Sequence, residues 1–423
     1  MPLSALPEPL QADQSVLIHG DRALSIAQLR ERVAGHRREL AAHAGSMLAL
    51  GGSDTLKLIA RLLAAEGVLD TVYLLPTRLW RDGIGEALQH SGACAAVLDD
   101  LTDPPSNGGA PTTRLNTQYA LATSGTTGQP CWHTHSSASL RRSIRPATAW
   151  DQALRWALLF DPCRFAGLQV LLQALGGGGS LLLCHDLDAE DQHSQIRHHK
   201  VNALSATPTW WRRALMLGGL DGLALRQITL GGEVADQALL DALQKRFPTA
   251  RIRHIYASTE AGVGFAVRDA MAGFPAAWLG QPVDGVSLRV DQHGHLCLKP
   301  PGQESFIDSG DLVERRGERL HFLGRASGVI NVGGHKVVPE VVEHTIRQVP
   351  GVAEARVFGM SSSMTGQLVA AEVVAKPGAD AKALRRHISQ TCSESLTRQQ
   401  CPAVIRMVDK LAVNPSGKLT RQT

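Results

Sequence analysis

The feature that most constrains the fold is an alternation of short apolar runs with amphipathic segments. Three such runs stand in the first hundred residues, "MLALGG", "TVYLLP" and "CAAVLDD", with helical spacing between them. The alternation returns in "SLLLC", "ALSA" and "RQITLGG", followed by the helical segment "DQALLDALQKRF". This order is typical of a parallel sheet covered by helices. The sequence therefore predicts an α/β body with parallel sheets.

The composition changes near residue 322. Beyond it, "EARVFGM" and "LVAAEVVAK" have the pattern of strands, whereas "VPEVVEHTIRQVPGV" and "AKALRRHISQTC" have the pattern of helices. These segments predict a small α+β domain of roughly a hundred residues. The segment "GRASG" is the expected linker. We therefore predict a large N-terminal domain over residues 1–324 and a small, mobile C-terminal domain over 325–423.

Charge and cysteine content exclude several classes of protein. The net charge of +4 comes from 43 basic and 39 acidic residues without a basic run, so no nucleic-acid partner is expected. Seven cysteines without a CxxC pair argue against a disulfide framework or a zinc site and favour the cytoplasm. The longest apolar stretch is interrupted by Gln169, Gln173 and a run of four consecutive glycines, so it predicts a buried helix, a turn and a strand rather than a membrane span.

A loop of small residues follows the apolar run that begins at Tyr119. Seven of the eight residues from Thr123 to Pro130 are Thr, Ser, Gly or Pro. Small residues let an anion approach backbone N–H groups, as a polyphosphate requires. The loop lacks the lysine of a Walker A motif, and small polar clusters are also typical of ordinary loops. The phosphate-binding hypothesis therefore depends on other segments.

Six segments in fixed order supply that support: "TSGTTGQP", "LGGE", "YASTE", "DSGD", "GRASGVINVGGHKVVPEVVE" and "NPSGKLTR". Together they resemble the adenylate-forming superfamily, which contains acyl- and aryl-CoA ligases, acid:carrier-protein ligases, amino-acid adenylation domains and luciferases. The resemblance extends from roughly Ala12 to the end, and the first hundred or so residues look shortened. It implies an AMP-forming acid–thiol ligase that uses ATP and Mg²⁺.

The resemblance also implies which residues bind the nucleotide: Thr123, Ser124, Gly125, Thr126, Thr127, Gly128, Gly232, Glu233, Tyr256, Ala257, Ser258, Asp311 and Arg325. The loop hydroxyls would hold the β- and γ-phosphates, Tyr256 would stack on adenine, and Asp311 would accept both ribose hydroxyls. Thr259 would contact the α-phosphate. Glu260, with Thr127, would coordinate Mg²⁺, which prefers hard oxygen ligands. Cys131 stands where the family often has lysine, and we expect it to be a small buried residue.

The C-terminal segments carry the implied catalytic machinery. Lys418 would bridge the carboxylate of the acid and the α-phosphate, with Thr259 and Glu260 as the other catalytic residues. Ser327 stands at the position of the family's hinge residue. The glycine-rich segment of the small domain would line the approach of a phosphopantetheine thiol, from a carrier protein or from CoA, through Gly333, Gly334 and Lys336.

The acid is the least constrained partner. The implied pocket residues are Arg164, Phe165, Gly167 and Gly231, and their mainly apolar character suits an aryl or medium acyl group. A competing hypothesis uses Asp161 to pair with the ammonium of an amino acid. A third hypothesis is a non-catalytic nucleotide-binding regulator, against which the intact Thr259, Glu260, Asp311 and Lys418 speak.

Overall fold

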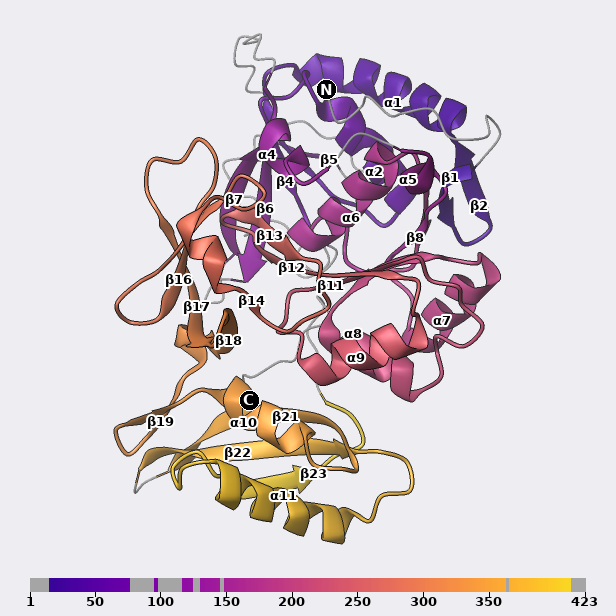
Figure 1. Cartoon of the computed structure of the whole chain (residues 1–423). Helices are drawn as coiled ribbons and strands as arrows, with labels where there is room; N and C mark the ends of the chain where they lie inside the picture. The colour runs from indigo at the N-terminus through magenta and orange to yellow at the C-terminus, as the bar shows by residue number, and fades with distance from the viewer. Residues whose placement is uncertain are drawn as a thin grey trace. The chain divides into compact units, whose positions relative to one another are not determined.

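The structure is a computed structural model, and it describes residues 15–76, 95–97, 116–124, 130–144, 148–362 and 365–411. Figure 1 labels the helices and strands of the chain, which divides into two compact units. The first unit comprises Met1–Ser205, Gly222–Ile228 and Ala257–Val263. The second unit comprises Ala206–Asp221, Thr229–Tyr256 and Gly264–Thr423.

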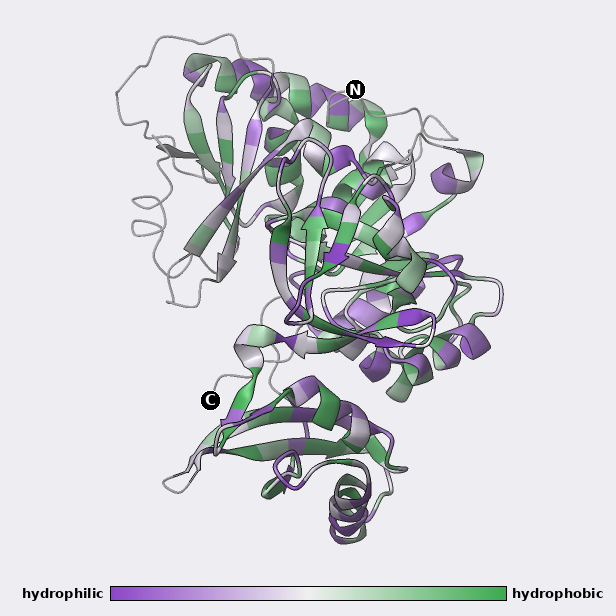
Figure 2. Ribbon diagram, turned by 60° about the vertical axis from the view of Figure 1, so that its left-hand side comes forward, coloured by the Kyte–Doolittle hydropathy of each residue, from purple (hydrophilic) through white to green (hydrophobic). Residues whose placement is uncertain are grey.

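The first unit begins with an antiparallel pair, β1 (Ser15–His19) and β2 (Arg22–Ser25), followed by α1 (Ile26–Leu40). Ser25 caps α1 by accepting from the N–H of Gln28, and the Gln28 side chain accepts from the Ser25 N–H. This capping box fixes where the helix starts. Hydrophobic and hydrophilic residues alternate along α1, at the top of Figure 2, and Leu29 is among those that it buries.

One sheet of the first unit has the strand order β5-β3-β4-β6-β7. The strands β3 (Met47–Leu50), β4 (Thr71–Leu74), β5 (Ala95–Val97) and β6 (Gln118–Ser124) are parallel. The last strand, β7 (Pro130–Ser136), is antiparallel to β6, so the two form a hairpin around the predicted phosphate loop. The buried helix α2 (Thr55–Ala65) follows β3 in the sequence, and the short helices α4 (Ser137–Arg141) and α5 (Ala149–Gln152) follow β7.

A second set of strands in the first unit runs in the order β10-β8-β9-β1-β2. The strands β8 (Arg155–Leu158), β9 (Ser180–Leu183) and β10 (Ala203–Ala206) are parallel, and α6 (Phe165–Gly176) and α7 (Ala189–His198) connect them. The helix, turn and strand predicted for the longest apolar stretch are confirmed by α6 and the fully buried β9. None of the helices in the described part of the chain has both the length and the apolar character that a membrane crossing needs.

The second unit holds α8 (Pro208–Met216) and α9 (Gln237–Arg246) together with most of the strands β11 (Gln227–Gly231), β12 (Arg251–Ser258) and β13 (Gly262–Val267). An antiparallel sheet in the order β14-β18-β17-β16-β15 follows. Its strands are β14 (Phe274–Pro275), β15 (Ser287–Val290), β16 (His295–Lys299), β17 (Ile307–Arg316) and β18 (Arg319–Arg325). Phe265 and Phe274 lie at the centre of its core.

The last part of the second unit has a core of its own. Its sheet has the order β20-β19-β22-β21, with β23 paired to β22. The strands are β19 (Ile330–Val332), β20 (His335–Val337), β21 (Val352–Ser362), β22 (Gly366–Ala375) and β23 (Val404–Met407), with helices α10 (Pro339–Arg347) and α11 (Ala381–Ser395). Val357 and Ile388 are fully buried in this separate core. It fits the predicted small α+β domain, whose boundary at residue 324 stays a prediction.

Candidate functional site

The strand β6 leads directly into the predicted phosphate loop. Tyr119 and Leu121 are fully buried, and Thr123 follows on the same face of the strand. The Thr123 hydroxyl donates to the carbonyl of Cys131, at 3.3 Å. Ser124 is the last residue of the strand. The loop residues Gly125, Thr126, Thr127 and Gly128 lie outside the described residues, so their predicted contacts with phosphate stay predictions.

Cys131 differs from the prediction. It lies directly across from Thr123 in the antiparallel pair, and its side chain is exposed. A residue at the end of an edge hairpin has solvent on one side, and this position is what makes the expectation of a buried cysteine wrong. The strand β7 therefore presents an exposed thiol beside the end of β6.

Two histidines of β7 were missed by the sequence analysis. His133 and His135 are two residues apart, so both side chains point to one face of the strand. His133 Nε2 lies 3.2 Å from Thr123 Oγ1 and 3.6 Å from Glu260 Oε1. His135 Nε2 lies 2.7 Å from the carbonyl oxygen of Thr259 and therefore carries the proton of that hydrogen bond. The spacing in "WHTHS" was the available signal.

The segment after β12 is held by side chains of β7 and α4. Besides the bond from His135, Arg142 donates to the carbonyls of Ala261 and Val263. Gly262 has φ +76°, a left-handed conformation that lets the chain turn there. Burial lowers the pKa of His135, so its ring is neutral at neutral pH. These contacts fix the backbone that carries Thr259 and Glu260.

Asp311 is the centre of a second group, in the second unit. Tyr256 donates its hydroxyl to Asp311 Oδ2 at 2.5 Å, and Arg325 Nε lies 3.0 Å from Asp311 Oδ1. Asp311 and Arg325 are cross-strand partners in the β17–β18 pair. Burial, with the Asp311 carboxylate, raises the pKa of Tyr256, so the phenol stays protonated. Two predicted nucleotide-binding residues, Asp311 and Arg325, therefore lie together.

The ring of Tyr256 belongs to an aromatic cluster. It is stacked with Phe265 at a centroid distance of 5.2 Å and with Phe322 at 5.0 Å. Aromatic pairs at this distance favour offset stacking. Phe265 and Phe322 therefore already pack against the Tyr256 ring. The predicted stacking of this ring on adenine stays a prediction.

The end of β11 brings the "LGGE" motif to the start of α8. Gly231 ends the strand, and Gly232 has φ +81°, which glycine adopts without strain. Glu233 Oε2 accepts from the backbone N–H of Thr209, at 3.0 Å. A carboxylate on the first N–H groups of a helix is stabilised by the helix dipole. Glu233 thus has a structural role beside the predicted nucleotide contact.

Three of the four predicted acid-pocket residues, Arg164, Phe165 and Gly167, lie at the start of α6. Phe165 is buried and lies 5.3 Å from the ring of His135. Gly167 packs so tightly that an added Cβ would lie 2.0 Å from the carbonyl oxygen of Asp161. Asp161 Oδ1 accepts from the N–H of Cys163, at 2.8 Å. Arg164 has a buried Nε with no hydrogen-bond partner among the described residues.

The remaining predicted residues belong to the last part of the chain. Ser327 lies in the 3₁₀ turn Ala326–Gly328. Gly333 and Gly334 form the exposed turn between β19 and β20, and Lys336 is exposed on β20. Lys418 lies outside the described residues, so its catalytic role stays a prediction.

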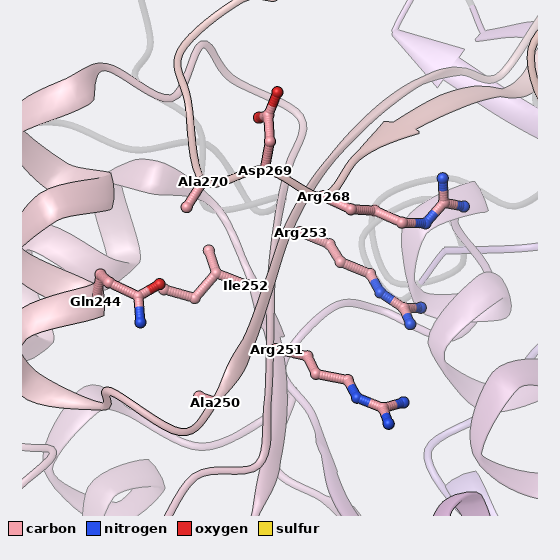
Figure 3. A pocket seen from close by; sticks show the side chains of 8 residues that line it. All are labelled: Gln244, Ala250, Arg251, Ile252, Arg253, Arg268, Asp269 and Ala270. Atoms are coloured by element: carbon pink, nitrogen blue, oxygen red, sulfur yellow. The ribbon is translucent and has the colours of Figure 1, made fainter.

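A pocket in the second unit contains none of the predicted site residues. It is lined by α9 and by the ends of β12 and β13, and Figure 3 shows Arg251, Arg253 and Arg268 extending in the same direction. Arg251 precedes Tyr256 by five residues of extended strand, about 17 Å. This pocket is therefore separate from the group around Asp311.

Two family models match the chain. The AMP-binding enzyme model matches residues 89–316, which is more than half of the 423 residues. The AMP-binding enzyme C-terminal domain model matches residues 341–418. The chain therefore belongs to the AMP-binding enzyme family. Within that class it is an AMP-forming ligase with the adenylate-forming fold, as predicted from the six motifs.

Curated relatives of two kinds are similar to this chain. It is 24% identical to 2-succinylbenzoate–CoA ligase from Bacillus licheniformis, over 97% of this chain and 96% of that protein. It is 25% identical to one of the plipastatin synthase polypeptides of Bacillus subtilis, over 72% of this chain. The match spans only 9% of that synthase polypeptide, whereas it spans nearly the whole ligase.

Solved structures share the fold along almost the whole chain. An anthranilate CoA ligase in complex with anthranoyl-AMP has a TM-score of 0.75 and 18% identity, covering 99% of this chain and 97% of that one. An o-succinylbenzoate coenzyme A synthetase from Bacillus subtilis, in complex with ATP and magnesium ion, has a TM-score of 0.68 and 20% identity, covering 97% and 96%. The predicted fold class is confirmed.

Proposed function

We propose that this chain activates a carboxylic acid with ATP and then transfers the acyl group to a phosphopantetheine thiol. The carboxylate attacks the α-phosphorus of ATP and releases pyrophosphate, which gives an acyl-adenylate. The thiol then attacks the acyl carbon, which gives a thioester and AMP. The nucleotide-dependent half follows from the family, whereas the acid and the thiol acceptor are part of the proposal.

One observation carries this proposal. The segment from Tyr256 to Glu260 is five residues long and has a predicted ribose-side contact at its first residue and a predicted phosphate-side ligand at its last. At one end, Tyr256 is bonded to Asp311, a carboxylate suited to the two hydroxyls of a ribose. At the other end, Glu260 is paired with His133 at the end of the phosphate-loop hairpin. A nucleotide needs these groups in this order, sugar and then phosphate.

Of the two predicted Mg²⁺ ligands, only Glu260 lies among the described residues. Among the described residues no group of three or more His, Cys, Asp or Glu side chains is arranged to hold a metal ion. Mg²⁺ is commonly bound by one or two carboxylates together with substrate phosphates and water, so a single Glu260 is enough on the protein side. Glu260, with the predicted Thr127, would hold the ion, which would neutralise phosphate charge during attack.

The chain's own residues would orient the reactants. His135 and Arg142 hold the backbone of the segment, so a fixed main chain would present Thr259 to the α-phosphate. Lys418 is the residue we propose to stabilise the developing charge between carboxylate and α-phosphate.

We propose an aryl or medium acyl acid as the substrate. Phe165, packed on His135, gives an aromatic and buried surface at the start of α6. The Arg164 Nε would be satisfied by an anionic or carbonyl group of the acid. The alternative, an amino acid, requires Asp161 for the ammonium, but its Oδ1 is used in a turn by the Cys163 N–H.

A thioester assay tests the function. Hydroxybenzoates, medium-chain fatty acids and amino acids are each offered with ATP, in one series with CoA and in another with a phosphopantetheinylated carrier protein. We expect AMP and thioester from aryl or medium acyl acids with at least one of the two acceptors. Activation of amino acids alone would favour the competing hypothesis, and the absence of pyrophosphate exchange with every acid would favour a regulator.

The free cysteines among the described residues fit an enzyme of a reducing compartment.

A further inference from the structure

The strand β7 offers a contact to the nucleotide site that its first residues do not supply. Thr123 is opposite Cys131, whose backbone carbonyl accepts from the Thr123 hydroxyl. The next residue on the same face is His133, opposite Leu121. Diagonal neighbours in an antiparallel pair are within reach of a long side chain. His133 uses this reach, since its Nε2 lies 3.2 Å from Thr123 Oγ1.

The proton on His133 follows from its neighbours. The Thr123 hydroxyl donates to the Cys131 carbonyl, so its oxygen is left to accept from the imidazole. Glu260 Oε1 lies 3.6 Å from the same Nε2, which is longer than a hydrogen bond. The Nε2–H tautomer therefore donates to Thr123 and turns the positive end of its N–H dipole towards the Glu260 carboxylate. The side chain of His133 is 22% exposed, against 45% for Glu260.

The two histidines contact different parts of the segment that contains Thr259 and Glu260. His135 binds the backbone carbonyl of Thr259, and this bond holds the main chain. His133 contacts the side chain of the next residue, Glu260. With the backbone fixed, the carboxylate position depends on rotation of the side chain, which contact with an imidazole restricts.

We propose that His133 is a positioning residue that holds the Glu260 carboxylate and the Thr123 hydroxyl in the geometry that magnesium–nucleoside triphosphate requires. This inference rests on the proposed function of the site and adds to it a residue of β7. His133 acts through Glu260 and does not contact the reacting atoms. Its removal should therefore weaken ATP binding in the presence of Mg²⁺ more than ATP binding without the metal.

Calorimetric titration of the full chain tests this inference. ATP is titrated in the presence of Mg²⁺ and again in EDTA, and the ratio of the two dissociation constants measures what the metal contributes. For His133→Ala we expect this ratio to fall about fivefold, the upper end of the scale for a partly exposed contact with a carboxylate. His133→Gln, which can place an amide N–H where Nε2–H lies, should restore most of the ratio. His387→Ala, an exposed histidine of α11, is the control and should leave the ratio unchanged.

A double-mutant cycle separates positioning through Glu260 from a general effect. If His133 acts through that carboxylate, His133→Ala should change the ratio less than twofold in a Glu260→Gln background. Additive losses, or an unchanged ratio in His133→Ala with an unchanged thermal unfolding midpoint, would overturn the inference. A wild-type chain that binds no ATP under either condition would instead contradict the proposed function, so the two failures are distinct.

Discussion

At the scale of single residues, several predicted site positions carry two roles. Asp311 holds Tyr256 and Arg325, and Glu233 accepts from the first turn of α8. Such contacts preorganise a side chain, because its rotamer is fixed before the ligand arrives. The sequence motif predicts which residue is present, whereas the partner that fixes it comes from a distant segment. Asp311, for example, is 55 residues from Tyr256.

Asp161 decides between an acid and an amino-acid substrate. Asp161→Asn keeps the oxygen that accepts from the Cys163 N–H, so the turn before α6 survives, but it removes the charge that an ammonium would need. We expect activity with the preferred aryl or acyl acid within a few-fold of wild type in the pyrophosphate-exchange assay. A loss of two orders of magnitude or more, together with a preference for amino acids in the wild type, would reject the acid that we propose.

Lys418 should separate the two half-reactions. We expect Lys418→Ala to slow adenylation on the order of a hundred- to a thousand-fold, because one preorganised contact to developing charge is lost. Thioester formation from chemically made acyl-adenylate and thiol should stay close to the wild-type rate. Rapid-quench assays of each half measure this. Equal damage to both halves, or adenylation that survives the change, would contradict the assigned role.

At the scale of elements, most helices and strands were predictable and most contacts between them were not. The N-cap at Ser25 and the helix–turn–strand from Phe165 to Leu183 follow from local patterns, namely capping chemistry and apolar runs. The strand β7 was not predicted. Its polar sequence "CWHTHS" comes directly after a loop of small residues, so it looks like more of the same loop. The function of His135 depends on a carbonyl 124 residues away, which no local pattern reveals.

An ion cluster joins α8, the start of α9 and the helix α10 within the second unit. Asp236 Oδ1 caps α9 at Leu239, and its Oδ2 lies 2.7 Å from Arg212 and 3.6 Å from Arg347. Burial on its own would raise the pKa of Asp236. The two guanidinium groups and the Leu239 N–H together outweigh burial, so the pKa of Asp236 is lowered overall. Its stabilising effect is therefore present above its unfolded-state pKa and is lost as the pH falls through the folded-state value.

Asp236→Ala should destabilise the chain by about 3 kcal/mol, because it removes a cap and leaves Arg212 without its nearest carboxylate in a buried site. Urea unfolding at pH 7 measures the change, and the difference from wild type should shrink as the pH is lowered below about 4. Asp188→Ala removes the exposed cap of α7 and should cost only about 1 kcal/mol. Equal losses in the two variants would show that the ion cluster adds nothing to the cap.

At the scale of the whole molecule, the C-terminal part of the chain matches its own family model and has a separate core that includes Ile330, and its mobility stays a prediction. Ser327 lies in the 3₁₀ turn before that core. Proline fixes φ and restricts the residue before it, so Ser327→Pro should limit rotation at this turn. We expect thioester formation to be impaired more than adenylation in half-reaction assays, and Ser327→Ala to behave like the wild type. The reverse order of damage would place the hinge elsewhere.

The hairpin of β6 and β7 has a consequence for how the phosphate loop can change over time. Both ends of the loop are set by one cross-strand pair, Ser124 and Pro130, and six further pairs behind it fix the register. Lengthening a loop whose ends are already held costs only a fraction of a kcal/mol per added residue, since closure entropy grows with the logarithm of length. The composition and length of the segment between these two ends can therefore change, in evolution or by design, with little effect on folding of the hairpin that holds it.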